Sequence, residues 1–238
     1  MSEAARPANS GRDRLICALD VESAAQARAL VTRLGGAAGW LKVGLELFTA
    51  EGPTVLSGLP EGRVFLDLKL HDIPETVGRA VARVARYAEV GMLTVHACGG
   101  RAMLARAVKE ASAMKILAVT VLTSLDATDL REVGDGGDVE DLVVRRARLA
   151  AEAGCHGVVC SPREAAIVRA DVPAGFLVVT PGVRPAGVPV GDQKRVATAA
   201  EAILAGASHV VVGRPIRDAA DPFAQANAIA AEIAGALA

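Results

Sequence analysis

The sequence predicts an α/β protein, a single (β/α)8 TIM barrel, from two features of its pattern. Short apolar segments alternate along the whole chain with longer Ala-, Arg- and Glu-rich segments of helical spacing, which is typical of a parallel sheet. Repeats of this kind, eight in about 230 residues, match the size of such a barrel. A doubly wound open sheet would alternate in the same way. The junction after the first strand, residues 19–23, has no GxGxxG motif and the chain has no GxxxxGK loop, so the barrel is favoured.

The strand predictions rest on short apolar runs. The longest runs, such as residues 116–119 and 157–160, have the length of buried parallel strands and are far too short to span a bilayer. In chain order, the predicted strands cover residues 14–20, 39–44, 63–69, 92–96, 115–122, 155–160, 176–180 and 208–213.

The helix predictions rest on helical spacing and on start signals. Ser23 precedes the first helical segment, and Pro74, Pro162 and Pro222 fit the first turns of later helices, where proline is favoured. In chain order, the helical segments include residues 23–34, 74–90, 100–113, 140–153, 195–206 and 221–237.

The chain is predicted to form one domain behind a short tail. Residues 1–13 are polar and lack the apolar core of a signal peptide, so we expect a flexible N-terminal tail followed by a barrel over residues 14–238. No low-complexity linker divides the chain, and the Gly- and Asp-rich residues 134–138 fit a single surface loop.

Composition excludes several classes of function. A net charge of −1 and an aromatic content of 3% argue against nucleic acid and an anionic membrane surface as partners. The four cysteines have no CxxC spacing, and most lie in apolar segments, so they fit core thiols of a reducing, cytoplasmic protein. The four histidines are scattered, which disfavours a metal site.

The predicted strand ends carry charged residues. Asp67 and Lys69 are two positions apart and would point to one face where their strand leaves the core, and Asp72 follows three residues later. Lys42 and Asp20 end two other strands. An ion pair that seals a strand end is the alternative, but the chain is 52% hydrophobic and buried charges are costly. Because the active site of a barrel lies at these strand ends, a catalytic site is the better interpretation.

Later strands end in polar residues as well. Thr123 and Ser124 follow the fifth strand, and Gly213 and Arg214 follow the last one, at the usual phosphate position of such barrels. Arg214 could equally be a solvated loop residue. The long loop after the seventh strand, residues 180–194, is either a lid or a wide exposed connection.

Three motifs together resemble the orotidine 5′-phosphate decarboxylase family. They are Asp67-Leu-Lys-Leu-His-Asp-Ile-Pro-Glu-Thr76, the loop with Thr180-Pro-Gly-Val-Arg184-Pro and Gly191-Asp-Gln193, and Val212-Gly-Arg214-Pro. The resemblance runs from about Leu15 to Arg217. Leu70 stands where an aromatic residue is common, and Glu75 where Asn is common; neither is a charged catalytic position.

The resemblance implies the reaction and the roles of the site residues. Orotidine 5′-phosphate would lose CO2 from C6 of its pyrimidine and give UMP, without a cofactor. Lys69 would stabilise and protonate the C6 carbanion, Asp67 would lie near the departing carboxylate, and Lys42 and Asp72 would complete a chain of alternating charges. The implied substrate contacts are Asp20 and Lys42 to the ribose, Thr123 and Ser124 to the pyrimidine, and Arg184, Gln193, Gly213 and Arg214 at the phosphate and its lid.

The resemblance also implies a homodimer with shared active sites, in which Asp72 and Thr76 reach the neighbouring subunit. Two other functions stay open at this point. On the same barrel, a metal-dependent sugar-phosphate decarboxylase or aldolase would use the two acids to bind Mg²⁺. A non-catalytic sensor of nucleotide phosphates would keep the pocket without the chemistry, although binding alone does not need a buried ammonium.

Overall fold

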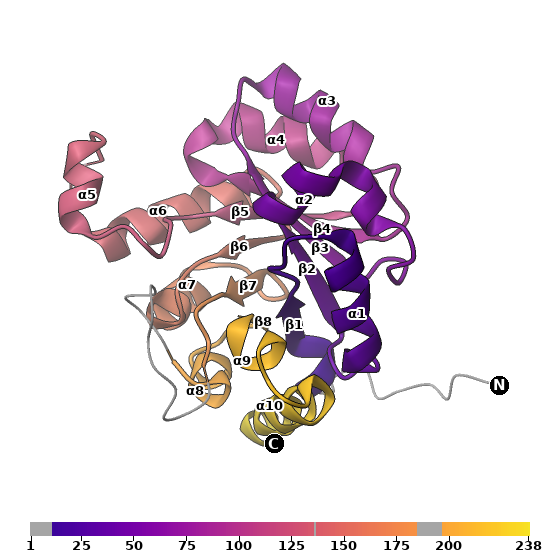
Figure 1. Cartoon of the computed structure of the whole chain (residues 1–238). Coiled ribbons are helices and arrows are strands. Elements are labelled where there is room, and N and C mark those ends of the chain that lie inside the picture. The colour runs from indigo at the N-terminus through magenta and orange to yellow at the C-terminus, as the bar shows by residue number, and fades with distance from the viewer. Residues whose placement is uncertain (1–10, 136, 185–196) are drawn as a thin grey trace.

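The strands form a closed parallel barrel in which each strand pairs with the next and the last pairs with the first (Figure 1). This computed structural model describes residues 11–135, 137–184 and 197–238. The closed parallel barrel confirms the predicted (β/α)8 fold. The strands are β1 (Leu15–Ala18), β2 (Trp40–Gly44), β3 (Val64–Leu70), β4 (Val90–His96), β5 (Lys115–Val119), β6 (Gly157–Val159), β7 (Leu177–Thr180) and β8 (His209–Val212).

Helices surround the barrel and cover its outer face (Figure 1). The α-helices are α1 (Ala24–Leu34), α2 (Leu45–Glu51), α3 (Pro74–Val84), α4 (Gly100–Glu110), α5 (Ala127–Glu132), α6 (Val139–Glu152), α7 (Ala165–Asp171), α8 (Ala199–Leu204), α9 (Arg214–Arg217) and α10 (Pro222–Leu237). The 3-10 helices are η1 (Gly11–Arg14), η2 (Gly52–Leu56), η3 (Ala97–Gly99) and η4 (Pro162–Glu164).

The predicted elements agree with the structure except in their ends and in the short helices. Each of the eight strands overlaps its predicted range; β4 begins two residues earlier than predicted, and β5 ends three residues earlier than predicted. The segment predicted as a helix over 74–90 ends at Val84, because the chain turns there and re-enters the barrel at Val90. The α2 helix was not predicted, since its N-cap is Gly44, which has no side chain to signal a start.

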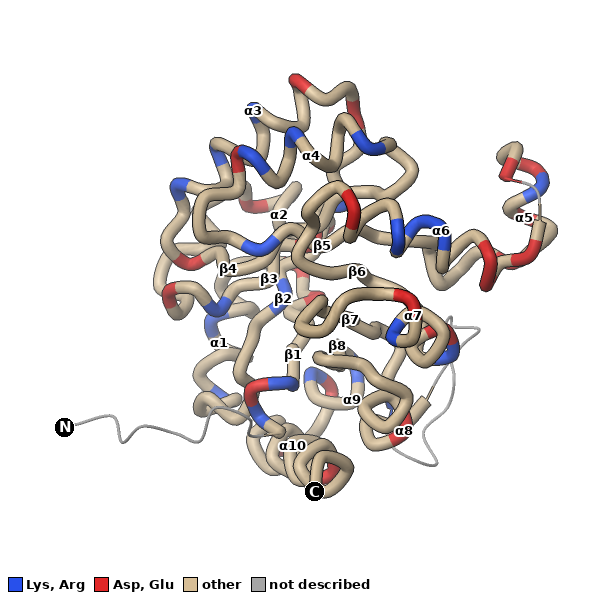
Figure 2. The backbone as a smooth tube through the Cα atoms, turned by 180° about the vertical axis from the view of Figure 1, so that it is seen from behind, with Lys and Arg blue, Asp and Glu red and all other residues tan. Residues whose placement is uncertain are grey.

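The core has two layers, and strand alternation sorts side chains between them. Inside the barrel pack Ile16, Trp40, Phe65, Met92 and Leu117 with neighbours from later strands, whereas Leu15, Leu41 and Val64 face the helices. Charged residues lie mainly on the outer helices and at strand ends (Figure 2). On each strand the inward-facing series continues toward the C-terminal end. Side chains that continue this series there therefore point into the barrel mouth.

The N-terminal end of the described chain lies at the start of β1 and packs against the last helix. The η1 helix packs against α10, and an added Cβ at Gly11 would lie 1.9 Å from the carbonyl oxygen of Ala230. Residues 1–10 of the predicted tail lie outside the described residues, and the boundary at residue 14 stays a prediction. Within the described residues, no helix is long and apolar enough to cross a membrane.

Candidate active site

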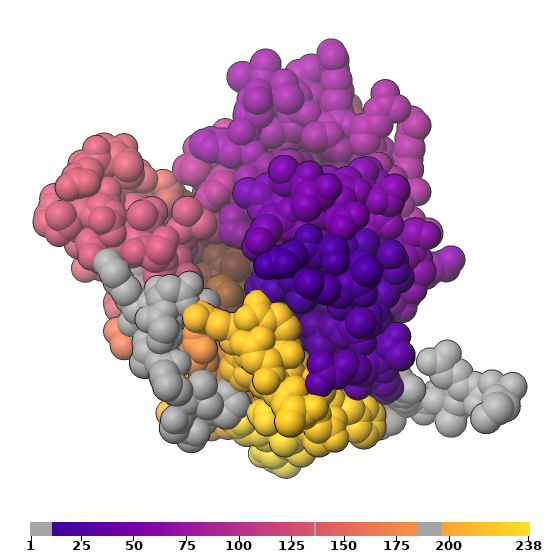
Figure 3. Space-filling model, in the orientation of Figure 1, coloured from indigo at the N-terminus to yellow at the C-terminus, as the bar shows by residue number. Residues whose placement is uncertain are grey.

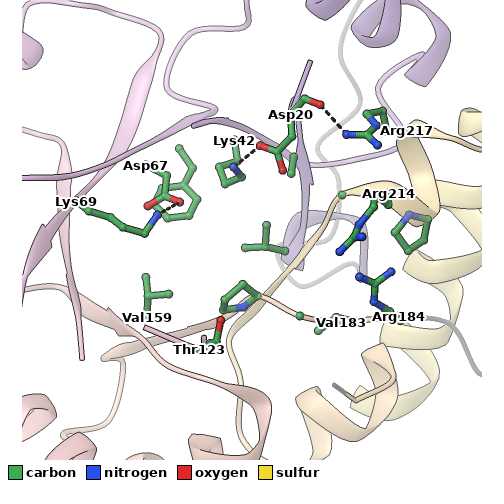
Figure 4. A pocket seen from close by; sticks show the side chains of 17 residues that line it. Asp20, Lys42, Asp67, Lys69, Thr123, Val159, Val183, Arg184, Arg214 and Arg217 are labelled. Carbon is green, nitrogen blue, oxygen red and sulfur yellow. Dashed lines mark hydrogen bonds and ion pairs between the residues drawn. The ribbon is translucent and has the colours of Figure 1, made fainter. Parts of the chain in front are cut away.

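A cavity of about 340 Å³ opens at the C-terminal ends of the strands. Figure 3 shows this face hollowed at its centre, beside the yellow surface of α9, and Figure 4 shows the side chains around the cavity. The lining residues come from every part of the barrel except β4; they are Ala18, Asp20, Lys42, Phe65, Asp67, Lys69, Thr123, Val159, Pro181, Gly182, Val183, Arg184, Val211, Gly213, Arg214, Pro215 and Arg217.

Among the described residues, two ion pairs join side chains that line this cavity. The Lys42 ammonium is 2.7 Å from a carboxylate oxygen of Asp20, and the Lys69 ammonium is 2.7 Å from one of Asp67. Lys42 follows Trp40 by two residues and Asp67 follows Phe65 by two, so both continue the inward-facing series of their strands. Gly44 leaves room for the first pair, because a Cβ there would lie 2.9 Å from the Lys42 nitrogen.

Strand alternation alone does not place Lys69. Its φ of 51° is in the left-handed region, which residues with a side chain rarely adopt. In the ladder, Leu66 pairs with Leu93 and Leu70 with Val95, so residues 67–69 of β3 face one residue of β4. The two side chains meet as predicted, but not through regular pleating. An irregularity in β3 brings Asp67 and Lys69 together instead.

Arginine side chains gather at the other end of the cavity (Figure 4). Arg184 is only 8% exposed, and its buried Nε has no hydrogen-bond partner among the described residues. Arg214 follows Gly213 at the end of β8, and Arg217 donates to the backbone carbonyl of Asp20 at 2.7 Å. A planar guanidinium is suited to phosphate oxygens, so this end of the cavity fits an anionic group.

Three predicted site residues, Ser124, Asp72 and Thr76, do not line the cavity. Thr123 lines the cavity, but its neighbour Ser124 is exposed and outside the lining. Asp72 and Thr76 are exposed beyond the end of β3, and the Asp72 carboxylate accepts a hydrogen bond from the backbone N–H of Ile73 at 2.6 Å. Gln193 lies outside the described residues.

Two polar residues that sequence reasoning missed contact the site residues. Thr94, fully buried on β4, donates from its hydroxyl to the Asp67 carboxylate at 2.9 Å. Its signal in the sequence is a lone hydroxyl between Leu93 and Val95, on the inward series that begins at Met92. Arg217 could not be singled out from the sequence, since arginines in surface turns are common.

Two groups near these charged pairs, His96 and Cys17, have pKa values shifted toward their neutral forms. Burial, followed by the nearby His71 and Lys69, lowers the pKa of His96 at the end of β4. Burial raises the pKa of the Cys17 thiol to about 12, so this residue stays a neutral core thiol. Within the described part of the chain, no group of three or more His, Cys, Asp or Glu side chains is arranged to hold a metal ion.

The family model described as "Orotidine 5'-phosphate decarboxylase / HUMPS family" matches residues 13–229, which is most of the chain. The chain belongs to the orotidine 5′-phosphate decarboxylase / HUMPS family. Residues outside the match are the first twelve and the end of α10.

Relatives within the orotidine 5′-phosphate decarboxylase / HUMPS family are similar over nearly their full lengths. An orotidine 5′-phosphate decarboxylase of Anaeromyxobacter dehalogenans is 56% identical over 92% of this chain and 97% of that protein. The enzyme of that name from Moorella thermoacetica is 53% identical over 93% of this chain and 92% of its own length. The crystal structure of the Lactobacillus acidophilus enzyme covers 92% of this chain and 98% of its own, with 34% identity and a TM-score of 0.79.

Proposed function

We propose that this protein is an orotidine 5′-phosphate decarboxylase, which converts orotidine 5′-phosphate to UMP and CO2 in de novo pyrimidine biosynthesis. One observation carries the proposal: the Lys69–Asp67 pair and the arginines Arg184 and Arg214 lie at opposite ends of one cavity. The substrate has the matching form, with a carboxylated ring at one end and a phosphate at the other. Relatives at 50–56% identity bear the name of this activity.

The chemical problem is the carbanion that forms at C6 when CO2 leaves. The ring offers no position that delocalises this charge, so a fixed positive group must stabilise it. The Lys69 ammonium is suited to that role because its ion pair with Asp67 orients it before the substrate binds. The same ammonium can then donate a proton to C6 as a general acid. This chemistry needs no cofactor.

Asp67 has two roles in this proposal. Its carboxylate orients Lys69, and it repels the substrate carboxylate until CO2 leaves as a neutral molecule. The side chain of Asp67 is only 14% exposed, so solvent screens this repulsion weakly. The repulsion is relieved in the transition state, which lowers the barrier.

The remaining lining residues would bind the other parts of the substrate. The Lys42–Asp20 pair lies between the reacting end and the arginines, where the ribose hydroxyls would be. Thr123 would contact the pyrimidine together with the next residue, Ser124. Gly213, Arg214 and Arg184 would bind the phosphate, together with Gln193 from the loop that follows β7. Binding energy from this distant phosphate would help to lower the barrier at C6.

We also propose a homodimer with shared active sites. Asp72 and Thr76 lie outside their own chain's cavity, on an exposed segment that follows β3. Ile73, between them, is 66% exposed, and Leu45, at the same end of the neighbouring strand β2, is 59% exposed. A partner subunit on this face would cover these two exposed apolar side chains. In that dimer, Asp72 would complete the charge network around Lys69 of the partner.

A cytoplasmic location fits the thiols. Cys98 is a free and exposed cysteine, whereas Cys17, Cys155 and Cys160 are free and buried. An exposed thiol is kept reduced most readily in the cytoplasm, so we place the enzyme there.

The deciding experiment follows the UV absorbance of orotidine 5′-phosphate on addition of purified protein, with and without EDTA. We expect conversion to UMP at the same rate in both samples, because Lys69 supplies the positive charge. Activity that is lost on chelation and restored by Mg²⁺ would favour a metal-dependent sugar-phosphate enzyme. Tight binding of UMP without turnover would favour a nucleotide-phosphate sensor.

A further inference from the structure

Thr94 lies opposite the irregular part of β3. Because Leu66 pairs with Leu93 and Leu70 with Val95, Thr94 is the β4 residue that faces positions 67–69. Its side chain has no solvent exposure, and it follows Met92 on the inward-facing side of the strand. The hydroxyl is therefore a buried polar group at the floor of the proposed site. A polar group left there without a hydrogen-bond partner would be costly.

The hydroxyl of Thr94 links the backbone of one site residue to the side chain of another. Its oxygen accepts a hydrogen bond from the backbone N–H of Lys69 at 2.8 Å. It donates to Oδ1 of Asp67 at 2.9 Å, while Oδ2 of Asp67 accepts from the Lys69 ammonium at 2.7 Å. The three residues thus form a closed ring of hydrogen bonds in which both carboxylate oxygens are engaged.

This ring includes the backbone of a residue in an unfavourable conformation. Lys69 has a φ of 51°, which is unfavourable for a residue with a Cβ. Such conformations persist when surrounding contacts over-determine them, and they cluster at functional sites. The bond from the Lys69 N–H to Thr94 is one such contact, and it acts on the residue whose ammonium must be aimed at C6.

We propose that Thr94 is a positioning residue, whose hydroxyl holds the Lys69 backbone and the Asp67 carboxylate in the geometry that the decarboxylation needs. The proposal rests on the proposed function. It assigns to Thr94 no contact with the substrate. The hydroxyl carries the role and the methyl group does not, because both hydrogen bonds use the oxygen.

The experiment compares Thr94→Val, Thr94→Ser and a control, Thr120→Val. Thr120 is also fully buried at this end of the barrel, and its hydroxyl donates to the carbonyl of Val159 at 3.0 Å. In Thr94→Val we expect kcat to fall about 10–100-fold with KM changed less than about threefold, since a hydrogen bond to a charged group is lost. Thr94→Ser should stay within about threefold of the wild type, and so should Thr120→Val.

A second readout is independent of turnover. The backbone N–H of Lys69 should exchange with solvent deuterium faster in Thr94→Val than in Thr94→Ser, because only the serine retains an acceptor. Thr94→Ala against Thr94→Ser makes the same comparison if the valine variant does not fold. If the wild-type protein does not decarboxylate the substrate, the proposed function fails, and exchange at Lys69 still tests the positioning.

Several outcomes would overturn the role of Thr94. They are an unchanged kcat in Thr94→Val, an equal loss of kcat in the serine and valine variants, a loss of the same size in Thr120→Val, or an unchanged exchange rate at Lys69. Each would mean that the hydroxyl does not set the geometry of the pair.

Discussion

At the scale of single residues, Lys69 combines an unfavourable backbone with an ion pair at the cavity. Lys69→Ala removes the charge that stabilises the carbanion and the proton donor together. We expect turnover to fall by several orders of magnitude with an unchanged circular-dichroism spectrum. Lys115→Ala, at an exposed lysine at the start of β5, is the control and should leave turnover unchanged. Retention of more than about a tenth of wild-type turnover in Lys69→Ala would place the proton donor elsewhere.

Arg214 is expected to recognise the phosphate. Arg214→Ala should weaken binding of UMP about 10–100-fold, because a charge-assisted hydrogen bond is lost. Binding of uridine should change little, since uridine lacks the phosphate. Calorimetric titrations with both ligands make the comparison. Equal losses for the two would mean that Arg214 acts on the fold or on the nucleoside.

His209 makes stability depend on pH. It lies at the start of β8, and its ring packs edge-on against Trp40 with the ring centroids 6.2 Å apart. Burial lowers the pKa of His209 from 6.5 to about 4. Between pH 6.5 and 4, His209 is therefore protonated in the unfolded chain and neutral in the folded chain. The free energy of unfolding falls as the pH is lowered through this window. At pH 4.5 the loss from this residue is about 2–3 kcal/mol relative to pH 7.5.

His209→Phe should be insensitive to this proton. Urea unfolding at the two pH values, at one protein concentration, should show that the variant loses less stability than the wild type. Acidic groups common to both proteins cancel in the comparison. Equal losses in the two proteins would contradict a lowered pKa of the partly buried His209.

The charged site residues could be predicted because they interrupt apolar strands at one end. Asp20, Lys42, Asp67 and Lys69 follow that rule, and all four line the cavity. Thr94 could not be singled out in this way, because a hydroxyl in a strand is usually satisfied by the backbone. The left-handed backbone of Lys69 also has no signal, since it depends on the register between two strands.

At the scale of secondary structure, strands were easier to predict than short helices. Most strand positions are buried, so the strands read as short, largely apolar runs. Helices such as α2 and α9 are held by their neighbours in the barrel and have little amphipathic pattern of their own. This explains why the barrel could be predicted while several of the helices around its mouth could not.

The packing of η1 on α10 gives a test of where the domain begins. Gly11→Ala would place a Cβ against the backbone of α10, and we expect a loss of about 1–3 kcal/mol in the free energy of unfolding. Gly235→Ala is the matched control, because an added Cβ there meets nothing within 4 Å and the helix should gain slightly. Removal of residues 1–10 should leave stability unchanged. Denaturant unfolding measures all three, and a loss on removing the tail would move the boundary upstream.

At the scale of the whole molecule, the proposed dimer places Asp72 in the partner's site. Lys69→Ala and Asp72→Ala homodimers should each be nearly inactive. In a mixed dimer one site carries both lesions and the other carries neither. Random exchange at equal amounts makes about half of the dimers mixed, so about a quarter of wild-type activity should return.

The control for that experiment is proof of subunit exchange, for example by native mass spectrometry. If subunits exchange and activity stays at the mutant level, Asp72 serves its own chain's site and the shared-site proposal is wrong. Assembly of this kind could not be predicted from the residues themselves, because exposed positions such as Ile73 look alike whether or not a partner covers them.

Closure of the barrel by β1 and β8 has a consequence for how the protein is made. Leu15 pairs with Val210, and Arg217 donates to the backbone of Asp20 across 197 positions of the chain. At roughly 5–20 residues per second, a ribosome needs on the order of 10–40 s to pass from one strand to the other. During that interval β1 has an open edge, which is an aggregation hazard. The nascent chain therefore acquires its pocket only after β8 and α9 have emerged.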